Sequence, residues 1–210
     1  MTTNIDAPFR KPAEAEYPIH ELIGERWSPR AFAPQPVEEE KLHSIFEAAR
    51  WAASAGNLQP WNFLFATKGN TEDHTRILEI LTPNNQGWAK EAPVLIVAVA
   101  QLYTIAGKER NSYYDLGMAV ENLVIQAGHF GLVAHQMGGF DGVKASELLH
   151  IPEGYVPVTM IALGYPGSPD GLHPTLRERE LAPRQRKPLS EFVFEGTWKQ
   201  PAPDANIMSL

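Results

Sequence analysis

The sequence predicts an α/β or α+β domain built around a largely buried sheet. Helix-like and strand-like segments alternate along the chain, which is typical of packed layers of helices on a sheet. Residues 94–100 (VLIVAVA) are uniformly apolar, as in a central strand covered on both faces. Hydrophobic residues make up 43% of the 210 residues and charged residues 20%, which is globular composition. A chain of this length buries about 70% of its unfolded surface, so one substantial core is expected.

The first strong element is a helix over residues 37–53. Pro36 precedes it, and residues 38–40 are glutamates, which suit the positive end of the helix dipole. One face repeats apolar side chains at a spacing of three and four, formed by Leu42, Ile45, Phe46, Ala49 and Ala53.

Later elements follow from the same patterns. Strands are predicted over 62–67, 94–100, 132–136 and 157–163. Helices are predicted over 71–81, 114–130 and 144–149, the second of them ending at Gly131. A last apolar piece at 189–194 follows a long loop rich in proline and charge, and we expect it to pack away from its own domain. We divide the chain into an arm (1–17), one domain (18–195) and a tail (196–210).

Composition excludes several classes of function. The net charge of −7 argues against sequence-independent nucleic-acid binding, which needs a basic face. The chain has no cysteine, so disulfides, thiolate catalysis and Cys-ligated metals are excluded. The N-terminal segment lacks the apolar core of a secretory signal, and the longest apolar run is too short to span a bilayer. We expect a cytoplasmic protein with no membrane or nucleic-acid partner.

Basic clusters stand out against this acidic background. Arg26-Trp27-Ser28-Pro29-Arg30 places two guanidiniums and a hydroxyl within five residues, and Arg184-Gln185-Arg186-Lys187 is a second cluster. Arginine presents a planar fork that matches phosphate oxygens two at a time. The first cluster is also compatible with a solvated basic turn whose arginines pair with nearby glutamates, and charge runs are usually solvated faces.

Two loops carry small and amide residues. Ser54, Gly56, Asn57 and Gln59 follow the first helix, where a backbone free of bulky side chains can approach a planar ligand. Gly138 and Gly139 follow a strand, where backbone N–H groups can face a ligand. Each stretch alone is equally consistent with an ordinary connecting loop or tight turn.

Other chemistries lack their signatures. The histidines form no close pair, so no metal site is expected. Ser54 is not in a nucleophile elbow, and neither a dinucleotide-binding glycine fingerprint nor a P-loop is present.

Taken together, the ordered segments resemble the FMN-dependent nitroreductase family over about residues 19–194. The resemblance rests on RWSPR, ASAGNLQPWNF, NNQGWAKEAPVLIV, YDLGMAVENLVIQAGHFGL, MGGFD, IPEGYVPVTMIALGYP and RQRKPLSEF, in that order. It implies an α+β fold, a mixed β-sheet flanked by helices, in an intertwined homodimer with FMN at each of two subunit interfaces.

The resemblance also implies roles for individual residues. Arg26 and Ser28 would contact the FMN phosphate and ribityl chain, Trp27 would contribute through its backbone, and Arg30 would face the pyrimidine edge of the ring. Ser54 and Asn57 would come from the partner subunit. The remaining cofactor-binding residues would be Asn85, with its neighbour Asn84 as the alternative, Gly138 and Gly139 near the reactive ring, and Arg184 and Arg186 over the phosphate.

The activity implied is that of a flavin oxidoreductase, with NAD(P)H as co-substrate and a small electron-poor acceptor such as a nitroaromatic, quinone or enone. No protein side chain is a catalytic candidate, because the flavin carries the chemistry. Two departures, Ala53-Ser54-Ala55 for the family's frequent Pro-Ser-Ser and Gly138 for a glutamate of some members, bear on substrate preference and flavin potential. The alternatives are a flavin-binding or sensory dimer without turnover, a flavin-fragmenting relative on the same fold, and a colourless structural dimer.

Overall fold

The computed structural model describes residues 9–104, 107–108 and 110–200. Its centre is a four-stranded sheet in the order β1-β2-β6-β5, formed by Trp61–Thr67, Val94–Gln101, Tyr155–Gly164 and Val133–Met137. All three strand pairings in this sheet are antiparallel. The α+β class is therefore confirmed, and the sheet formed by the described residues contains none of the parallel pairings that a mixed sheet would add.

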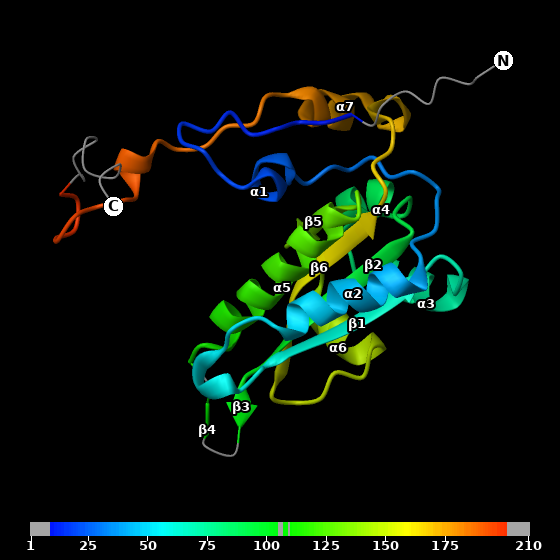
Figure 1. Cartoon of the computed structure of the whole chain (residues 1–210). Helices are drawn as coiled ribbons and strands as arrows, with labels where there is room; N and C mark the ends of the chain where they lie inside the picture. Colours follow the sequence, from blue (N-terminus) through cyan, green and yellow to red (C-terminus); the bar gives the residue numbers. More distant parts are fainter. Residues whose placement is uncertain (1–8, 105–106, 109, 201–210) are drawn as a thin grey trace.

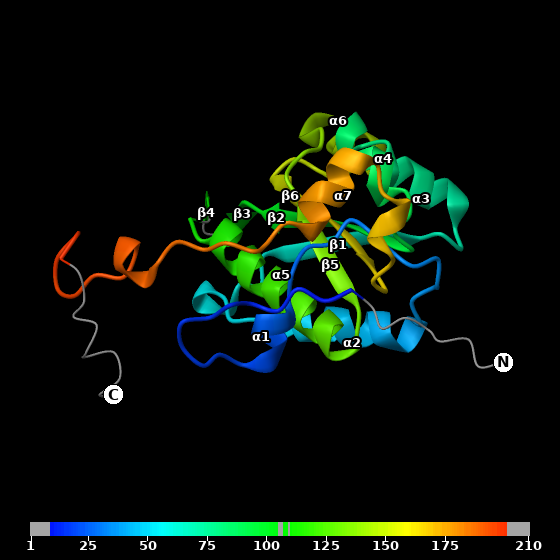
Figure 2. The ribbon, with the colours of Figure 1, turned by 90° about the horizontal axis from the view of Figure 1, so that it is seen from above.

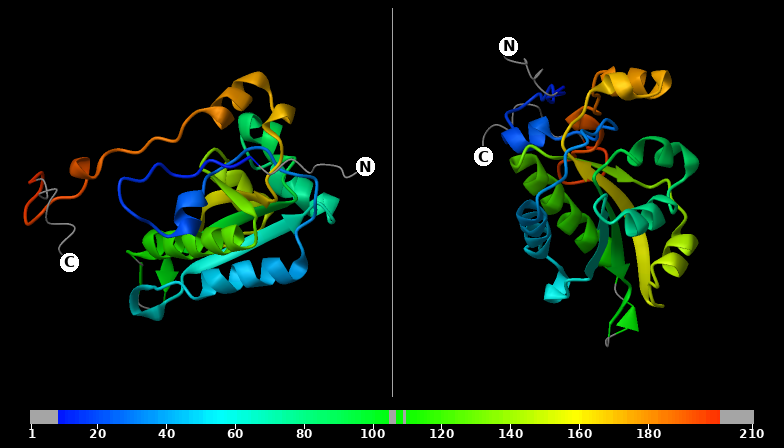
Figure 3. Two further views of the ribbon diagram at one scale, coloured as in Figure 1. Left: turned by 45° about the horizontal axis from the view of Figure 1, so that its top comes forward. Right: turned by 90° about the vertical axis from the view of Figure 1, so that its right-hand side faces the viewer.

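Helices cover both faces of the sheet (Figures 1 and 2). On one face lie α2 (Glu39–Arg50) and α5 (Ser112–His129), which pack against each other and the sheet. On the other face lie α3 (Thr71–Leu78), α4 (Pro83–Ala89) and α6 (Gly142–Leu148). The right-hand view of Figure 3 shows these layers with the sheet between them.

Strand β2 explains why the core has two halves. Its residues 94–100 are all buried, because side chains alternate between the two covered faces. Val94, Ile96 and Ala98 belong to the cluster on the α2 and α5 side, whereas Leu95 and Val97 belong to the cluster on the α3, α4 and α6 side.

The C-terminal end of α5 is fixed by a glycine, as the sequence predicts. Gly131 has φ +71°, a backbone conformation that favours glycine. The N–H of Leu132 donates to the carbonyl of Ala127, and the N–H of Gly131 donates to that of Gly128, which is a Schellman cap. This cap turns the chain directly into β5.

Three helices of the structure are not among those predicted. Helix α1 (Glu21–Glu25) buries no residue, and α4 contains Asn, Gln and Gly between Pro83 and Ala89. Helix α7 (Pro174–Leu181) is mostly exposed, and its buried residue is the charged Glu180. None of them carries the apolar periodicity that identifies a helix from sequence. Short 3-10 turns occur at Ala55–Asn57 (η1), Pro169–Gly171 (η2) and Leu189–Glu191 (η3), and Tyr103–Thr104 (β3) pairs with Gly107–Lys108 (β4).

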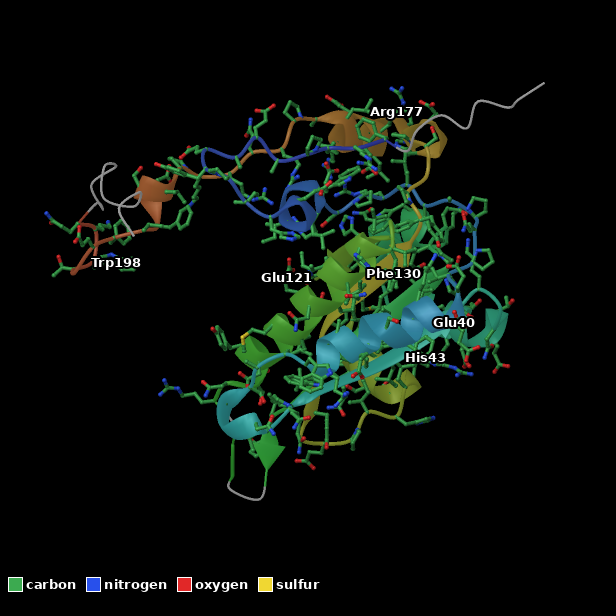
Figure 4. All side chains as sticks on the ribbon, in the orientation of Figure 1. Glu40, His43, Glu121, Phe130, Arg177 and Trp198 are labelled. Atoms are coloured by element: carbon green, nitrogen blue, oxygen red, sulfur yellow. The ribbon has the colours of Figure 1, made fainter. Side chains whose placement is uncertain are left out.

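The chain after α7 runs back along the N-terminal segment and then away from the sheet (Figure 3, left). Phe192 and Trp198 on this C-terminal segment are exposed, Trp198 by 82%. Figure 4 shows Trp198 far from the sheet. The last apolar piece thus lies apart from the core, as expected. The division into arm, domain and tail stays a prediction.

Candidate functional site

The segment that carries Arg26, Trp27, Ser28 and Arg30 runs from α1 across the top of the sheet. The N–H of Arg26 closes α1 by donating to the carbonyl of Leu22, and Pro29 is buried. His135 on β5 binds the carbonyl of Pro29 through Nδ1 at 2.9 Å. Since a carbonyl only accepts, Nδ1 carries the hydrogen. The segment is therefore tied to the sheet at its centre.

The two arginines of this segment are partly exposed and only loosely paired. Arg26 Nε lies 4.0 Å from Glu121 Oε1 on α5, and the Arg26 side chain is 22% exposed. Figure 4 shows Glu121 on α5. Arg30 Nη1 lies 3.6 Å from Glu180 Oε2, with 25% of the Arg30 side chain exposed. The glutamate pairing considered for a solvated turn is thus present, but neither contact reaches hydrogen-bond length.

Arg184 reaches the same region from the other end of the chain. Its Nη1 donates to the carbonyl oxygens of Lys11 at 2.7 Å and Gly24 at 2.8 Å. Burial lowers the pKa of the Arg184 guanidinium, and the nearby charges of Arg26 and Arg186 lower it further. The structure therefore brings Arg26 and Arg184 close together, and Arg186 lies beside them on the exposed segment after α7.

Lys11 joins this basic cluster and is a residue that sequence reasoning missed. Its Nζ donates to the carbonyl of Glu180 at 2.9 Å and lies 5.0 Å from the centre of the Trp27 ring. Burial lowers the pKa of Lys11; Glu180 opposes this shift, and Arg184 and Arg30 reinforce it. A lone lysine in an irregular arm carries no sequence signal for this role.

Trp27 uses its side chain to hold the arm. Its ring meets Phe9 edge-on at 5.7 Å and lies below Lys11. This leaves its backbone as the part that can face a ligand. A hollow of about 300 Å³ lies beside it, lined by arm, α1 and α5 residues that include Arg26, Trp27, Leu22 and Gly128.

Asn85, Gly138 and Gly139 form a second group, on α4 and the loop after β5. Asn85 Nδ2 donates to the carbonyl of Gly139 at 3.0 Å, whereas Asn84 is exposed. A Cβ at Gly139 would meet Asn85 Nδ2 at 2.7 Å, and a Cβ at Gly138 would meet nothing within 4 Å. Asn85 is thus the asparagine that supports the loop, and Gly138 leaves open space.

Trp88 and His135 link this group to the arginine segment. The Trp88 ring on α4 lies 4.6 Å from the His135 ring, and the Arg30 guanidinium carbon lies 6.0 Å from its centre. Burial lowers the pKa of His135 to about 4, and the Arg30 charge acts in the same direction. His135 is therefore neutral at neutral pH and serves as a structural hydrogen-bond donor.

Ser54 and Asn57 do not meet the other predicted residues within the chain. Ser54 Oγ accepts from the N–H of Gln59 at 3.0 Å, and the N–H of Ala55 donates to Asp115 in the first turn of α5. Arg26 lies beside Glu121, roughly 9 Å further along that helix at 1.5 Å per residue. Figure 1 shows η1 near the N-terminal end of α5 and α1 beyond its middle. One chain therefore presents two separate parts of the predicted site.

A larger hollow of about 1040 Å³ is lined by residues of α4, α6, β6 and the loops beside them, including Thr82, Phe140, Lys144 and Tyr155. It contains none of the predicted residues, so we assign the site to the basic cluster and the glycine loop. Among the described residues, no helix is long and apolar enough to cross a membrane. That same part of the chain holds no group of three or more His, Cys, Asp or Glu side chains placed to bind a metal.

The fold and this cluster define an α+β protein with a group of basic side chains gathered at one end of its sheet. The chain belongs to the nitroreductase family: the family's model matches residues 23–82 and 70–165. The predicted family is thus confirmed.

Individual relatives agree with this assignment. A crystal structure described as an oxidoreductase containing FMN is 38% identical, has a TM-score of 0.84, and covers 89% of this chain and 96% of its own. A protein of Archaeoglobus fulgidus whose name pairs NADH dehydrogenase with NAD(P)H nitroreductase is 30% identical over 69% of this chain and 83% of its own length. An NADH dehydrogenase of Thermus thermophilus is 28% identical over 80% of this chain and 91% of its own.

Proposed function

We propose that the protein is a homodimeric, FMN-dependent oxidoreductase that takes hydride from NAD(P)H and reduces electron-poor acceptors. Membership of the nitroreductase family supports the reaction class. The similarity to an FMN-containing oxidoreductase and to proteins named for NADH and NAD(P)H chemistry supports the cofactor and the reductant. The acceptor classes we propose are nitroaromatics, quinones and enones.

One observation carries the proposal: basic side chains from both ends of the chain gather at one place. Arg184 binds the carbonyl of Gly24, 160 residues earlier in the sequence, and the nearby charges of Arg26 and Arg186 add to burial in lowering the pKa of Arg184. Like charges held close together raise the free energy of a protein unless an anion shares them. A phosphate group is the anion that arginine forks match best.

The residues present fit FMN. Arg26, Ser28, Arg184 and Arg186 supply guanidinium and hydroxyl donors for the phosphate and ribityl chain. Arg30 supplies a cation for the pyrimidine edge of the ring, and Asn85 supports the loop at Gly139. Gly138 lacks a side chain where a Cβ would meet open space, which allows a planar ring to approach the backbone.

When bound, FMN supplies the redox chemistry, accepting two electrons from NAD(P)H and passing them to the acceptor. The protein's part is binding and electrostatics. Arg30 favours negative charge at the pyrimidine edge, and the open surface at Gly138 admits one planar substrate at a time. NAD(P)H and the acceptor would then bind in turn, which gives ping-pong kinetics. We assign no side chain as a general acid. The protons that the reduced acceptor takes up therefore come from solvent in this proposal.

Energies support the arginine assignment. Micromolar to nanomolar binding of FMN requires roughly 8–12 kcal/mol. A charge-assisted hydrogen bond contributes about 1.5–3 kcal/mol. Three arginines at the phosphate therefore account for a large share of the affinity.

The dimer completes the site in this proposal. Ser54 and Asn57 lie near the N-terminal end of α5, apart from Arg26 and Arg184. In the proposed dimer, these two residues of one chain contact the flavin that the arginines of the other chain hold. Exposed aromatic side chains on the same end of α5, Tyr113 and Tyr114, favour burial against another chain.

The test is an acceptor screen on the purified protein. We expect a yellow dimer whose flavin is bleached by NADH or NADPH and restored by menadione or nitrofurazone, with parallel lines in double-reciprocal plots. Bound FMN that neither nucleotide reduces would instead favour the flavin-binding or sensory protein. Consumption of the flavin itself during turnover would favour a flavin-fragmenting enzyme.

A further inference from the structure

Helix α7 buries a carboxylate where a surface helix normally buries apolar side chains. Its sequence is PTLREREL, and Glu180 is its buried residue, with a side chain 1% exposed. The neighbouring Leu181 is 41% exposed. Burying a carboxylate is unfavourable unless partners compensate for the lost water. Together with Leu176, which packs against the core, the partners of Glu180 hold the helix in place.

Both oxygens of the Glu180 carboxylate lie near Arg30, and one of them also meets Ala31. Oε1 accepts hydrogen bonds from the backbone N–H of Arg30 at 2.7 Å and of Ala31 at 3.1 Å. Oε2 has no hydrogen bond within the described structure and lies 3.6 Å from Nη1 of Arg30. Glu180 thus holds the backbone of Arg30 with one oxygen and faces its guanidinium with the other.

The surroundings of this pair are basic and aromatic. Lys11 Nζ binds the main-chain carbonyl of Glu180 and not its carboxylate. Trp88 lies beside Arg30, with its ring centre 6.0 Å from the guanidinium carbon. Because the neighbouring charges are positive, the Glu180 carboxylate is the group that reduces the positive potential at Arg30.

We propose that Glu180 is the positioning residue for Arg30, an inference that rests on the proposed FMN function. Its two backbone hydrogen bonds fix the chain at Arg30 and Ala31. Its free oxygen sets the direction and the effective charge of the guanidinium at the flavin's pyrimidine edge. Glu180 acts only through Arg30 and touches no reacting atom.

The effect of the Glu180 charge on the reduction potential of bound FMN has a definite sign. Reduced FMN carries more negative charge than oxidised FMN, so an unopposed Arg30 favours the reduced form. Glu180 opposes that preference and lowers the reduction potential. Removing the charge while keeping the acceptor should therefore raise the potential.

Two variants separate the roles. Glu180→Gln keeps a carbonyl oxygen for both N–H groups and removes the charge; Glu180→Ala removes both. Glu178→Gln, an exposed carboxylate on the same helix, is the matched control. The measurements are the midpoint potential of bound FMN, FMN affinity by fluorescence quenching, and amide exchange of a peptide covering residues 26–33 in the flavin-free protein.

For Glu180→Gln we expect oxidised FMN to bind within threefold of wild type and the reduced form to gain about tenfold over the oxidised form, a rise of about 30 mV for a two-electron couple. For Glu180→Ala we expect at least tenfold faster exchange at residues 30–31 and at least tenfold weaker FMN binding. Glu178→Gln should match wild type.

An unchanged potential in Glu180→Gln overturns the charge role. Unchanged exchange and affinity in Glu180→Ala overturn the backbone role. If Glu180→Ala does not fold, Glu180→Gln still decides the charge role. If the wild-type protein binds no FMN, the proposed function fails and the charge role fails with it, whereas the exchange measurement still decides whether Glu180 fixes the Arg30 backbone.

Discussion

The side-chain amide of Asn85 donates a hydrogen bond to the carbonyl oxygen of Gly139 at 3.0 Å. The N–H of Thr82 donates to the same carbonyl, so α4 and the loop after β5 are joined at one atom. A Cβ at Gly139 would lie 2.7 Å from Asn85 Nδ2 and 3.2 Å from Thr82 Oγ1. A β-carbon at position 139 would therefore displace the Asn85 amide from this hydrogen bond.

Gly139→Ala should destabilise the flavin-free protein by about 1 kcal/mol, because the added methyl group displaces the Asn85 amide and its hydrogen bond to Gly139 is lost. Gly138→Ala, one residue away in open space, should leave the free energy of unfolding within about 0.5 kcal/mol. It should nevertheless weaken FMN binding by about tenfold, because its methyl group meets the approaching ring. Chemical denaturation and flavin titration measure the two effects. Equal stability of the two variants would refute the packing argument.

Arg26→Ala should weaken FMN binding at least tenfold, because one charge-assisted hydrogen bond of about 1.5–3 kcal/mol is lost. Arg177→Ala is the matched control: Arg177 is exposed on α7, pairs with Asp170, and is labelled in Figure 4. The measurement is flavin retained after dialysis, together with the dissociation constant. Full occupancy of Arg26→Ala after dialysis would remove Arg26 from the phosphate site.

Acid should destabilise the protein partly through His135. Burial lowers its pKa in the folded state to about 4, below the ordinary value of 6.5. The unfolded chain therefore takes up a proton first, and stability present above pH 6.5 is lost as the pH falls toward 4, by roughly 3 kcal/mol at most. Burial also lowers the pKa of His74, which acts in the same direction.

His135→Gln should flatten this loss, because glutamine can still donate to the Pro29 carbonyl but does not titrate. Urea unfolding at pH 7 and pH 4.5 gives the change in the free energy of unfolding between the two pH values for each variant. A destabilisation that is the same at both pH values cancels in this comparison. His43→Gln, which changes an exposed histidine on α2, is the control and should follow wild type. A His135→Gln curve parallel to wild type would contradict the assignment.

Tyr114→Glu should weaken the proposed dimer and, with it, flavin binding. Tyr114 is 72% exposed on α5, near the η1 turn that carries Asn57. Sedimentation velocity should show a shift toward monomer, and FMN should be lost in proportion. Val143→Glu changes an equally exposed side chain on α6, across the sheet, and should keep both the dimer and the flavin. A monomeric variant that holds FMN as tightly as wild type would show that one chain suffices.

Sequence patterns predicted the elements that bury an apolar face. Helix α5, with Leu116, Leu123 and Ala127 in the core, and the fully buried strand β2 both follow directly from hydrophobic spacing. Helix α7 could not be found this way, because its buried residue is a glutamate, Leu181 is exposed, and Leu176 alone packs against the core. The family resemblance supplied the pairing of Arg26 with Arg184, which no local pattern contains.

The sequence was less informative about what supports the site. Lys11, Trp88, His135 and Glu180 meet around the arginine segment only through the tertiary fold. A lone lysine, a core histidine or a glutamate in a charged helix forms no sequence motif that would indicate such a role. Their roles depend on distances between segments up to 169 residues apart, which periodicity does not encode.

The most direct test of the central claim is the flavin content and reducibility of the purified protein. The account predicts tightly bound FMN, close to one per chain of a dimer, whose visible absorbance is bleached by NAD(P)H under anaerobic conditions and recovers when menadione is added. A protein that stays colourless after incubation with FMN, or that binds FMN which NAD(P)H does not bleach, would contradict it.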